Sequence, residues 1–192
     1  MKIRRIPLAA AVMAAAVACH TETVHETPTE TVVTDTRPLD PVSGRGGVLT
    51  LEEFVSRAGA DGLTEIHLAE IARARARDEK VRELAQTVLI DHTRISERLA
   101  SIAASKNLAV PNALPPDGKE IVARLTAVGE GEVDREYLRT LIDEHRKAIE
   151  LYGLATTSSL DPAFAGFAAE TLPILQRHHE EAERLAGAGG PD

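Results

Sequence analysis

The sequence contains no tryptophan, and only 3% of its 192 residues are aromatic. A core cannot be built around large rings, so it must consist mainly of Ala, Leu, Ile and Val, which suit closely packed helices. Hydrophobic residues still make up 43% of the chain, which is typical of a globular protein. A chain of this length has room for one domain with additional segments.

Cysteine is nearly absent, because Cys19 is the only one and no internal disulfide can form. Residues 1–5 (MKIRR) are basic, and residues 6–18 (IPLAAAVMAAAVA) form an apolar run. This run is too short to span a bilayer, for which ~20 residues are needed. The pattern predicts a signal peptide over residues 1–18 and export from the cytoplasm.

The sequence AVAC (16–19) resembles a bacterial lipobox, although that motif prefers Leu at the position of Ala16. The alternative is an ordinary cleavage site with small residues at Ala16 and Ala18. Because the only cysteine falls at this position, we expect Cys19 to be lipidated. His20, in place of an aspartate, then favours anchoring in the outer membrane, on the periplasmic side of the envelope.

Residues 20–49 are rich in Thr, Pro and Gly and contain no aromatic residue. Such a composition cannot bury enough surface to fold, so residues 19–49 are predicted to be a lipidated, disordered tether. A short disordered tail is expected at residues 188–192. The folded domain then covers residues 50–187.

Positive charge is scarce outside the leader. The formal net charge is −8, and residues 1–18 contain three basic and no acidic side chains. Their removal leaves 19 basic against 30 acidic residues, a net charge of −11. Such a surface repels phosphate backbones, so nucleic acid is not expected as a partner.

Apolar residues repeat at helical spacing along the domain. Thr50 and Glu53 form a capping-box pattern, and Asp161 followed by Pro162 is typical of another helix start. The apolar stripes predict long helices over residues 51–76, 81–102, 137–152 and 164–185, and a short helix over 119–128. We expect an all-α four-helix bundle.

The connections between the long helices are short, long and short. The long middle connection, which contains the extra helix, can travel the length of the bundle at ~3.3 Å per extended residue. It therefore permits a ferritin-like topology with one long crossover. A plain up-down-up-down bundle, with the extra helix capping one end, is the alternative that the helical pattern leaves open.

Each apolar stripe contains one carboxylate or imidazole side chain, and these are Glu65, His92, His145 and His178. Counted from the helix turns at 1.5 Å per residue, Glu65 and His92 differ in height by ~1.5 Å, and His145 and His178 by ~5 Å. The four side chains are therefore expected to converge inside the bundle. Imidazole and carboxylate suit a single transition metal such as zinc, iron or copper.

Two considerations bear on the hypothesis of a metal site. A dinuclear ferritin centre needs Glu-x-x-His, but Leu89, Ile142 and Leu175 stand three residues before the histidines. A hydrogen-bonded polar layer could also fix helix register without binding anything. Five further acidic or histidine residues lie off the stripes, and we expect them to face solvent: Asp91, Asp143, Glu144, His67 and His179.

The segments FVSRAGADGLTEIHLAEIA, AQTVLIDHTRISERLASIA, EVDREYLRTLIDEHRKAIELY and FAAETLPILQRHHEEAERL together resemble the bacterial envelope family called domain of unknown function 4142. The resemblance covers about residues 50–186. It implies a ferritin-like bundle that is usually exported and whose activity is not established.

No nucleophile elbow, phosphate loop, dinucleotide fingerprint or His-Glu-x-x-His motif occurs, so an enzyme is not the favoured hypothesis. The first hypothesis is a lipid-anchored envelope module that binds a protein or small-molecule partner. The second is a mononuclear metal-binding protein using Glu65, His92, His145 and His178. The third is a purely structural envelope protein.

Overall fold

The computed structural model describes residues 49–158 and 160–188. The predicted signal peptide, Cys19 and nearly all of the predicted tether lie outside this part of the chain. Within it the regular elements are helices only: α1 (Leu51–Arg75), α2 (Glu79–Ala104), α3 (Pro116–Ala127), the 3-10 turn η1 (Glu130–Glu132), α4 (Val133–Thr157) and α5 (Pro162–Ala188). The predicted all-α fold class is confirmed.

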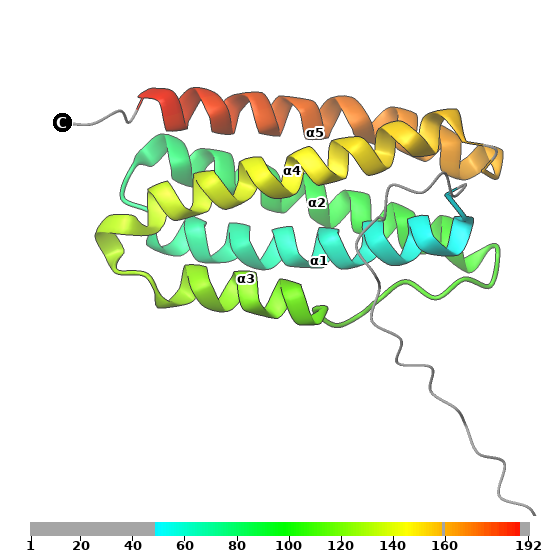
Figure 1. The fold of residues 1–192 in the computed structure, drawn as a ribbon, viewed down its shortest axis with the longest axis horizontal. Helices are drawn as coiled ribbons and strands as arrows, with labels where there is room; N and C mark the ends of the chain where they lie inside the picture. The colour runs from blue at the N-terminus through cyan, green and yellow to red at the C-terminus, as the bar shows by residue number, and fades with distance from the viewer. Residues whose placement is uncertain (1–48, 159, 189–192) are drawn as a thin grey trace, which may run out of the picture. The chain divides into compact units, whose positions relative to one another are not determined.

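Helices α1, α2, α4 and α5 form the bundle (Figure 1). Helix α1 packs against α2 and α4, and α5 packs against the same two helices from the other side. Within the bundle, each helix is antiparallel to the two helices that it packs against, whereas α2 and α4 run in the same direction. The α2–α4 connection therefore returns along the whole bundle, which is the ferritin-like topology. The alternative, with an extra helix capping one end, is wrong, because α3 lies alongside α1 and α4.

The helix starts follow the sequence signals. At Thr50 the capping box is complete, since the Glu53 amide donates to Thr50 Oγ1 (3.2 Å) and the Thr50 amide donates to Glu53 Oε2 (3.0 Å). Asp161 accepts a hydrogen bond from the amide of Ala163 at 3.0 Å at the start of α5. Helix α3 begins at Pro116, earlier than predicted, because proline is well suited to the first helical position.

Close approach to α1 holds the crossover against the bundle. A Cβ atom added at Gly59 would lie 2.6 Å from Val110 Cγ1, and one added at Gly118 would lie 2.5 Å from Thr64 Oγ1. The guanidinium of Arg75 then donates to the carbonyls that end α3, including those of Thr126 and Val128, both at 2.7 Å. These contacts satisfy carbonyls that a helix end leaves unpaired. They fix α3 beside α1.

The turn between α1 and α2 is tied to the start of α4. Asp134 Oδ1 accepts hydrogen bonds from the backbone amides of Arg77 (3.0 Å) and Asp78 (3.3 Å). The first hairpin is therefore anchored to the second at this end of the bundle. In the described residues, no helix combines the length and apolar character that crossing a membrane requires.

The apolar core is divided into two parts along the bundle axis. One part lies toward the α1–α2 turn and includes Leu68, Val88, Tyr137, Leu141 and Ala182. The other lies toward the opposite end and includes Phe54, Ile95, Leu151, Phe164 and Leu175. In every bundle helix, the boundary between the two parts falls at a buried polar residue. A polar layer therefore crosses the bundle near its middle.

Candidate metal centre

The polar layer contains one side chain from each bundle helix. Glu65 (α1), His92 (α2), His145 (α4) and His178 (α5) are each no more than 3% exposed. The imidazole centroids are 5.3 Å apart for His92 and His145, 5.7 Å for His92 and His178, and 5.4 Å for His145 and His178. The structure thus brings together the four side chains that interrupt the apolar stripes.

The carboxylate of Glu65 lies between two of the imidazoles. Its Oε2 is 3.0 Å from His92 Nδ1, and its Oε1 is 2.8 Å from His145 Nδ1. The distances are short, but the ring nitrogens do not aim directly at the oxygens, so neither contact is a well-aligned hydrogen bond. Both rings turn Nδ1 toward α1, which leaves Nε2 of each ring for the interior of the layer.

His178 is held from the other side. Its Nε2 lies 3.0 Å from Asp91 Oδ2 on α2, and its Nδ1 lies 3.3 Å from His145 Nε2. Asp91 therefore has the same relation to His178 that Glu65 has to the other two rings. Each imidazole has one nitrogen against a carboxylate and the other directed away from it.

Several polar atoms of this layer lack a hydrogen-bond partner in the described part of the chain. They are Glu65 Oε1, His92 Nδ1, His92 Nε2 and His145 Nδ1, and all but His92 Nε2 nevertheless lie in the close carboxylate–imidazole contacts described above. A buried polar atom without a partner costs about 1–3 kcal/mol. A layer whose only role was structural would be expected to give His92 Nε2 a partner as well.

The electrostatics favour an anionic Glu65 and a neutral His178. Burial raises the pKa of Glu65, but attraction to the rings of His92 and His145, each with a nitrogen within 3.0 Å of the carboxylate, outweighs burial and holds this pKa well below its ordinary value. Burial, together with repulsion from His145 and His92, lowers the pKa of His178 to about 4, although Asp91 opposes this shift. At neutral pH, His178 therefore presents an unprotonated nitrogen.

The inward nitrogens fit one metal ion. One nitrogen from each of His92, His145 and His178 lies within 4.8 Å of the other two. Nitrogens bound tetrahedrally to zinc at ~2.05 Å are about 3.3–3.4 Å apart. The nitrogens of His145 and His178 are already at 3.3 Å, so binding would require the ring of His92 to move inward by ~1 Å or a little more.

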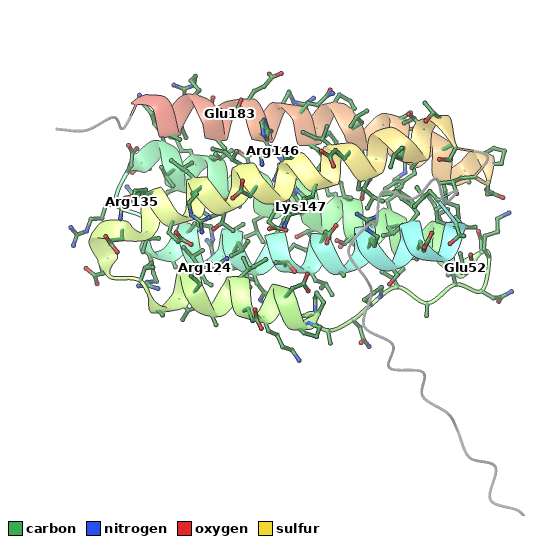
Figure 2. All side chains as sticks on the ribbon, viewed as in Figure 1. Glu52, Arg124, Arg135, Arg146, Lys147 and Glu183 are labelled. Atoms are coloured by element: carbon green, nitrogen blue, oxygen red, sulfur yellow. The ribbon has the colours of Figure 1, made fainter. Side chains whose placement is uncertain are left out.

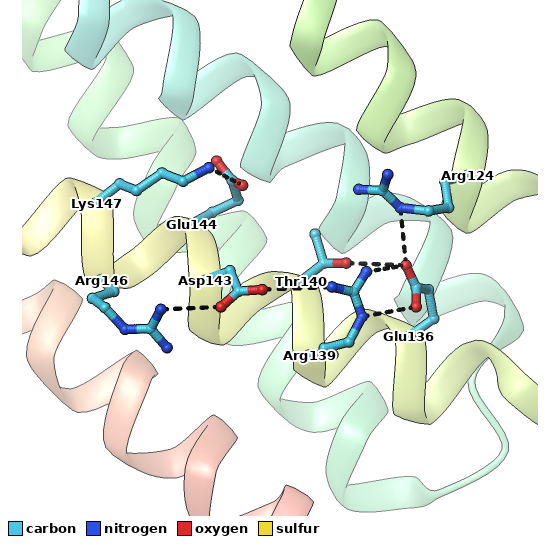
Figure 3. Close-up of polar contacts among 8 residues, drawn as sticks. All are labelled: Arg124, Glu136, Arg139, Thr140, Asp143, Glu144, Arg146 and Lys147. Atoms are coloured by element: carbon cyan, nitrogen blue, oxygen red, sulfur yellow. Dashed lines mark hydrogen bonds and ion pairs between the residues drawn. The ribbon is translucent and has the colours of Figure 1, made fainter. Parts of the chain in front are cut away.

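The carboxylates next to His145 in sequence take no part in this layer. Asp143 pairs with Arg146 at 3.2 Å, and Glu144 pairs with Lys147 at 2.9 Å. These pairs belong to a row of polar contacts on the outer side of α4 (Figure 3). Charged side chains cover the outside of the bundle in the same way (Figure 2). Glu144 is nevertheless partly buried, because its side chain is only 13% exposed.

Two further histidines lie outside the layer. The side chain of His67 is 46% exposed, as predicted, and it is close to Glu70. The expectation that His179 faces solvent is wrong, because its side chain is only 17% exposed and its Nε2 is buried. Tyr137 packs in the core, and its hydroxyl has no hydrogen-bond partner among the described residues.

Asp91 is the residue of the centre that the sequence did not predict. A position next to His92 on a helix points ~100° away from it, which indicates solvent. The structure shows instead that Asp91 faces the α2–α5 groove, where His178 reaches it. The only available signal in the sequence was the position of this acidic residue directly before a histidine of an apolar stripe.

Comparison with known protein families identifies the family of this chain. The sequence profile of the family described as Domain of unknown function (DUF4142) matches residues 42–185. The chain belongs to this family. A comparison with curated proteins yields no match.

Among solved structures, the chain is similar to the crystal structure of a DUF305 fragment from Deinococcus radiodurans. The TM-score is 0.64 at 16% sequence identity, over 71% of this chain and 95% of that one. At this identity the similarity concerns the fold alone. It agrees with the helical bundle that the sequence pattern predicts.

Proposed function

We propose that the bundle binds a single transition-metal ion through His92, His145 and His178. The observation that supports this most strongly is the convergence of three buried imidazoles, with one nitrogen of each within 4.8 Å of the other two. An ion held by the inward nitrogens would also give a partner to His92 Nε2, which has no hydrogen-bond partner among the described residues. The hypothesis of a metal-binding protein is therefore preferred to that of a module with a purely hydrogen-bonded layer.

Glu65 and Asp91 act on the ligands in this proposal. Histidines that bind metals commonly donate their other N–H to a carboxylate, which fixes the tautomer and the ring orientation. Glu65 is placed to do this for His92 and His145, and Asp91 for His178. The sequence suggested Glu65 as a fourth ligand, but the observed position favours this orienting role.

The donor set narrows the kind of metal. Neutral imidazoles suit zinc, copper, iron and nickel, whereas magnesium and calcium prefer oxygen ligands. Three imidazoles leave a tetrahedral ion one further position. We propose binding of zinc, copper or iron without assigning a reaction, because no nucleophile or substrate-binding group accompanies the centre in the described residues.

The test is the metal content of protein purified without chelators. Elemental analysis should find about one equivalent of metal in the wild type and little in a His92→Ala, His145→Ala double variant. A His67→Ala, His179→Ala double variant is the matched control, since it also removes two imidazoles but both lie outside the layer. The control should retain the wild-type metal content.

Thermal unfolding gives a second measurement. A ligand present at one hundred times its Kd stabilises the folded state by about 2.7 kcal/mol. Metal-free protein whose melting temperature does not change with zinc, copper or iron would contradict the proposal. The polar layer would then serve only to fix the register of the helices, in a bundle with a binding or structural role.

We also propose that this domain is exported and held at the outer membrane, on its periplasmic side, by a lipid on Cys19. Support comes from the basic start, the apolar run over residues 6–18 and the position of the only cysteine. Palmitate should label the wild-type protein and not a Cys19→Ser variant. Unlabelled wild type would contradict the anchor without affecting the metal proposal.

A further inference from the structure

A surface pocket of about 480 Å³ lies between α2 and α5 and ends at the candidate metal centre. Asp91 and His178 form part of its lining, together with Thr87 on α2 and Arg177 on α5. A smaller hollow of about 240 Å³ also borders Asp91, but His178 is not among its lining residues. Only the larger of these two hollows therefore reaches an imidazole of the layer.

The polar layer is buried on the side of the bundle that α1 and α4 form. The side chains of Glu65, His92 and His145 are at most 3% exposed. Helix α3 packs on α1 and α4, which lie opposite the α2–α5 groove. The side chain of Asp91, in contrast, is 24% exposed. Asp91 is therefore the polar group of the centre that solvent reaches most easily.

We infer that a hydrated divalent cation reaches the histidines through the α2–α5 pocket, with Asp91 as the first protein group it meets and His178 as the side chain that turns aside to admit it. This inference rests on the proposed function, because it describes how the same site is loaded. The lining as a whole is balanced in charge, since it carries three basic side chains and three acidic ones: Lys80, Arg177 and Arg184 against Glu83, Asp91 and Glu181. Selection of a cation therefore depends on Asp91, the carboxylate that contacts His178 where the pocket meets the layer.

Two polar contacts hold the ring of His178 in its position. Its ring is anchored at one edge by Asp91 on the pocket side, and a polar contact to His145 lies at the other edge. A cation bound to Asp91 replaces the hydrogen bond that holds Nε2 and frees the ring to rotate. The same ring then closes behind the ion, with Nδ1 as a ligand.

The chain offers a matched pair of variants to test this route. Thr87 and Thr93 are both exposed on α2, and each hydroxyl donates to the carbonyl of the residue four positions earlier. Thr87 lines the pocket, whereas Thr93 lines neither hollow. Thr87→Trp places an indole over the route, and Thr93→Trp adds the same side chain elsewhere on the helix.

The measurement is the rate of Co²⁺ uptake by the metal-free full-length protein, followed by stopped-flow absorption of the bound ion. Thr87→Trp should slow both uptake and release at least tenfold while the equilibrium Kd stays unchanged, because it obstructs the path and not the site. Thr93→Trp should take up Co²⁺ at the wild-type rate. Wild-type rates in Thr87→Trp, with Co²⁺ still bound tightly, overturn the route alone. Failure of the wild type to bind Co²⁺, zinc, copper or iron overturns the proposed function and the route with it.

Discussion

Nε2 of His145 lies 3.3 Å from Nδ1 of His178, across the hairpin that joins α4 and α5. Both atoms belong to rings whose other nitrogen is close to a carboxylate, Glu65 for one and Asp91 for the other. Two nitrogens at this distance either share a proton or bind a common ion, since facing lone pairs repel. The pair is thus the part of the centre that is already at the spacing of metal ligands.

The role of Glu65 can be tested by Glu65→Gln, which keeps the shape of the side chain and removes its charge. The amide presents an N–H group toward one ring N–H, so one buried donor loses its acceptor. We expect the metal-free protein to lose about 2 kcal/mol of unfolding free energy. Metal affinity should fall about 10–100-fold, as it does when outer carboxylates are removed from histidine ligands.

Urea unfolding and chelator competition measure the two effects. Glu70→Gln is the control, because Glu70 also approaches a histidine, His67, but both side chains are about half exposed. It should change neither stability nor affinity by a measurable amount. Unchanged metal affinity in Glu65→Gln would show that the carboxylate does not orient the ligands.

Asp91→Asn tests the carboxylate on the pocket side. The amide oxygen can still accept from His178 Nε2, so the fold should be retained, but the charge that stabilises the metal-bound imidazole is lost. We expect a 10–100-fold weaker Kd for zinc. Asp143→Asn, on an exposed carboxylate that pairs with Arg146, is the control and should leave the Kd unchanged.

The bundle was predictable because each of its helices has clear local signals in the sequence. Apolar residues at helical spacing and the caps at Thr50 and Asp161 are local signals, and local signals determine where helices begin and end. The polar layer was predictable for a related reason. Residues that interrupt an apolar stripe at similar distances from the turns must lie at similar depths.

What the sequence could not provide depends on contacts between helices. The place of α3 beside α1 is determined by close approach at Gly59 and Gly118, which no periodicity reveals. The position of Glu65 between two rings depends on side-chain rotation. Asp91 was missed because its angle on α2 does not tell which side chain of α5 crosses the groove to meet it.

The close approach at Gly59 leads to a stability prediction. In Gly59→Ala, the new methyl group would lie 2.6 Å from Val110 Cγ1 and 2.9 Å from Pro111 Cδ, so the crossover must move. We expect a net loss of about 1–2 kcal/mol, because the strain exceeds the gain of ~1 kcal/mol in helix propensity. Gly153→Ala on α4 is the matched control: no atom lies within 4 Å of its new methyl group, so it should stabilise the protein by about 0.5–1 kcal/mol. Chemical denaturation measures the change in unfolding free energy of both variants. Equal stabilisation by Gly59→Ala and Gly153→Ala would contradict the close packing at Gly59.

Asp61, one turn before Glu65 on α1, should make stability depend on pH. Burial and the nearby carboxylates of Glu65 and Glu144 raise the pKa of Asp61 to about 7. A raised pKa means that the folded state binds a proton more tightly than the unfolded state. Its contribution to stability is therefore complete below pH ~4 and is lost as the pH rises through about 7. With chelator present, wild type should lose about 1–3 kcal/mol more than Asp61→Asn between pH 5 and pH 8, as measured by urea unfolding. Parallel pH profiles for the two proteins would show that Asp61 is ionised in the folded bundle as readily as in the unfolded chain.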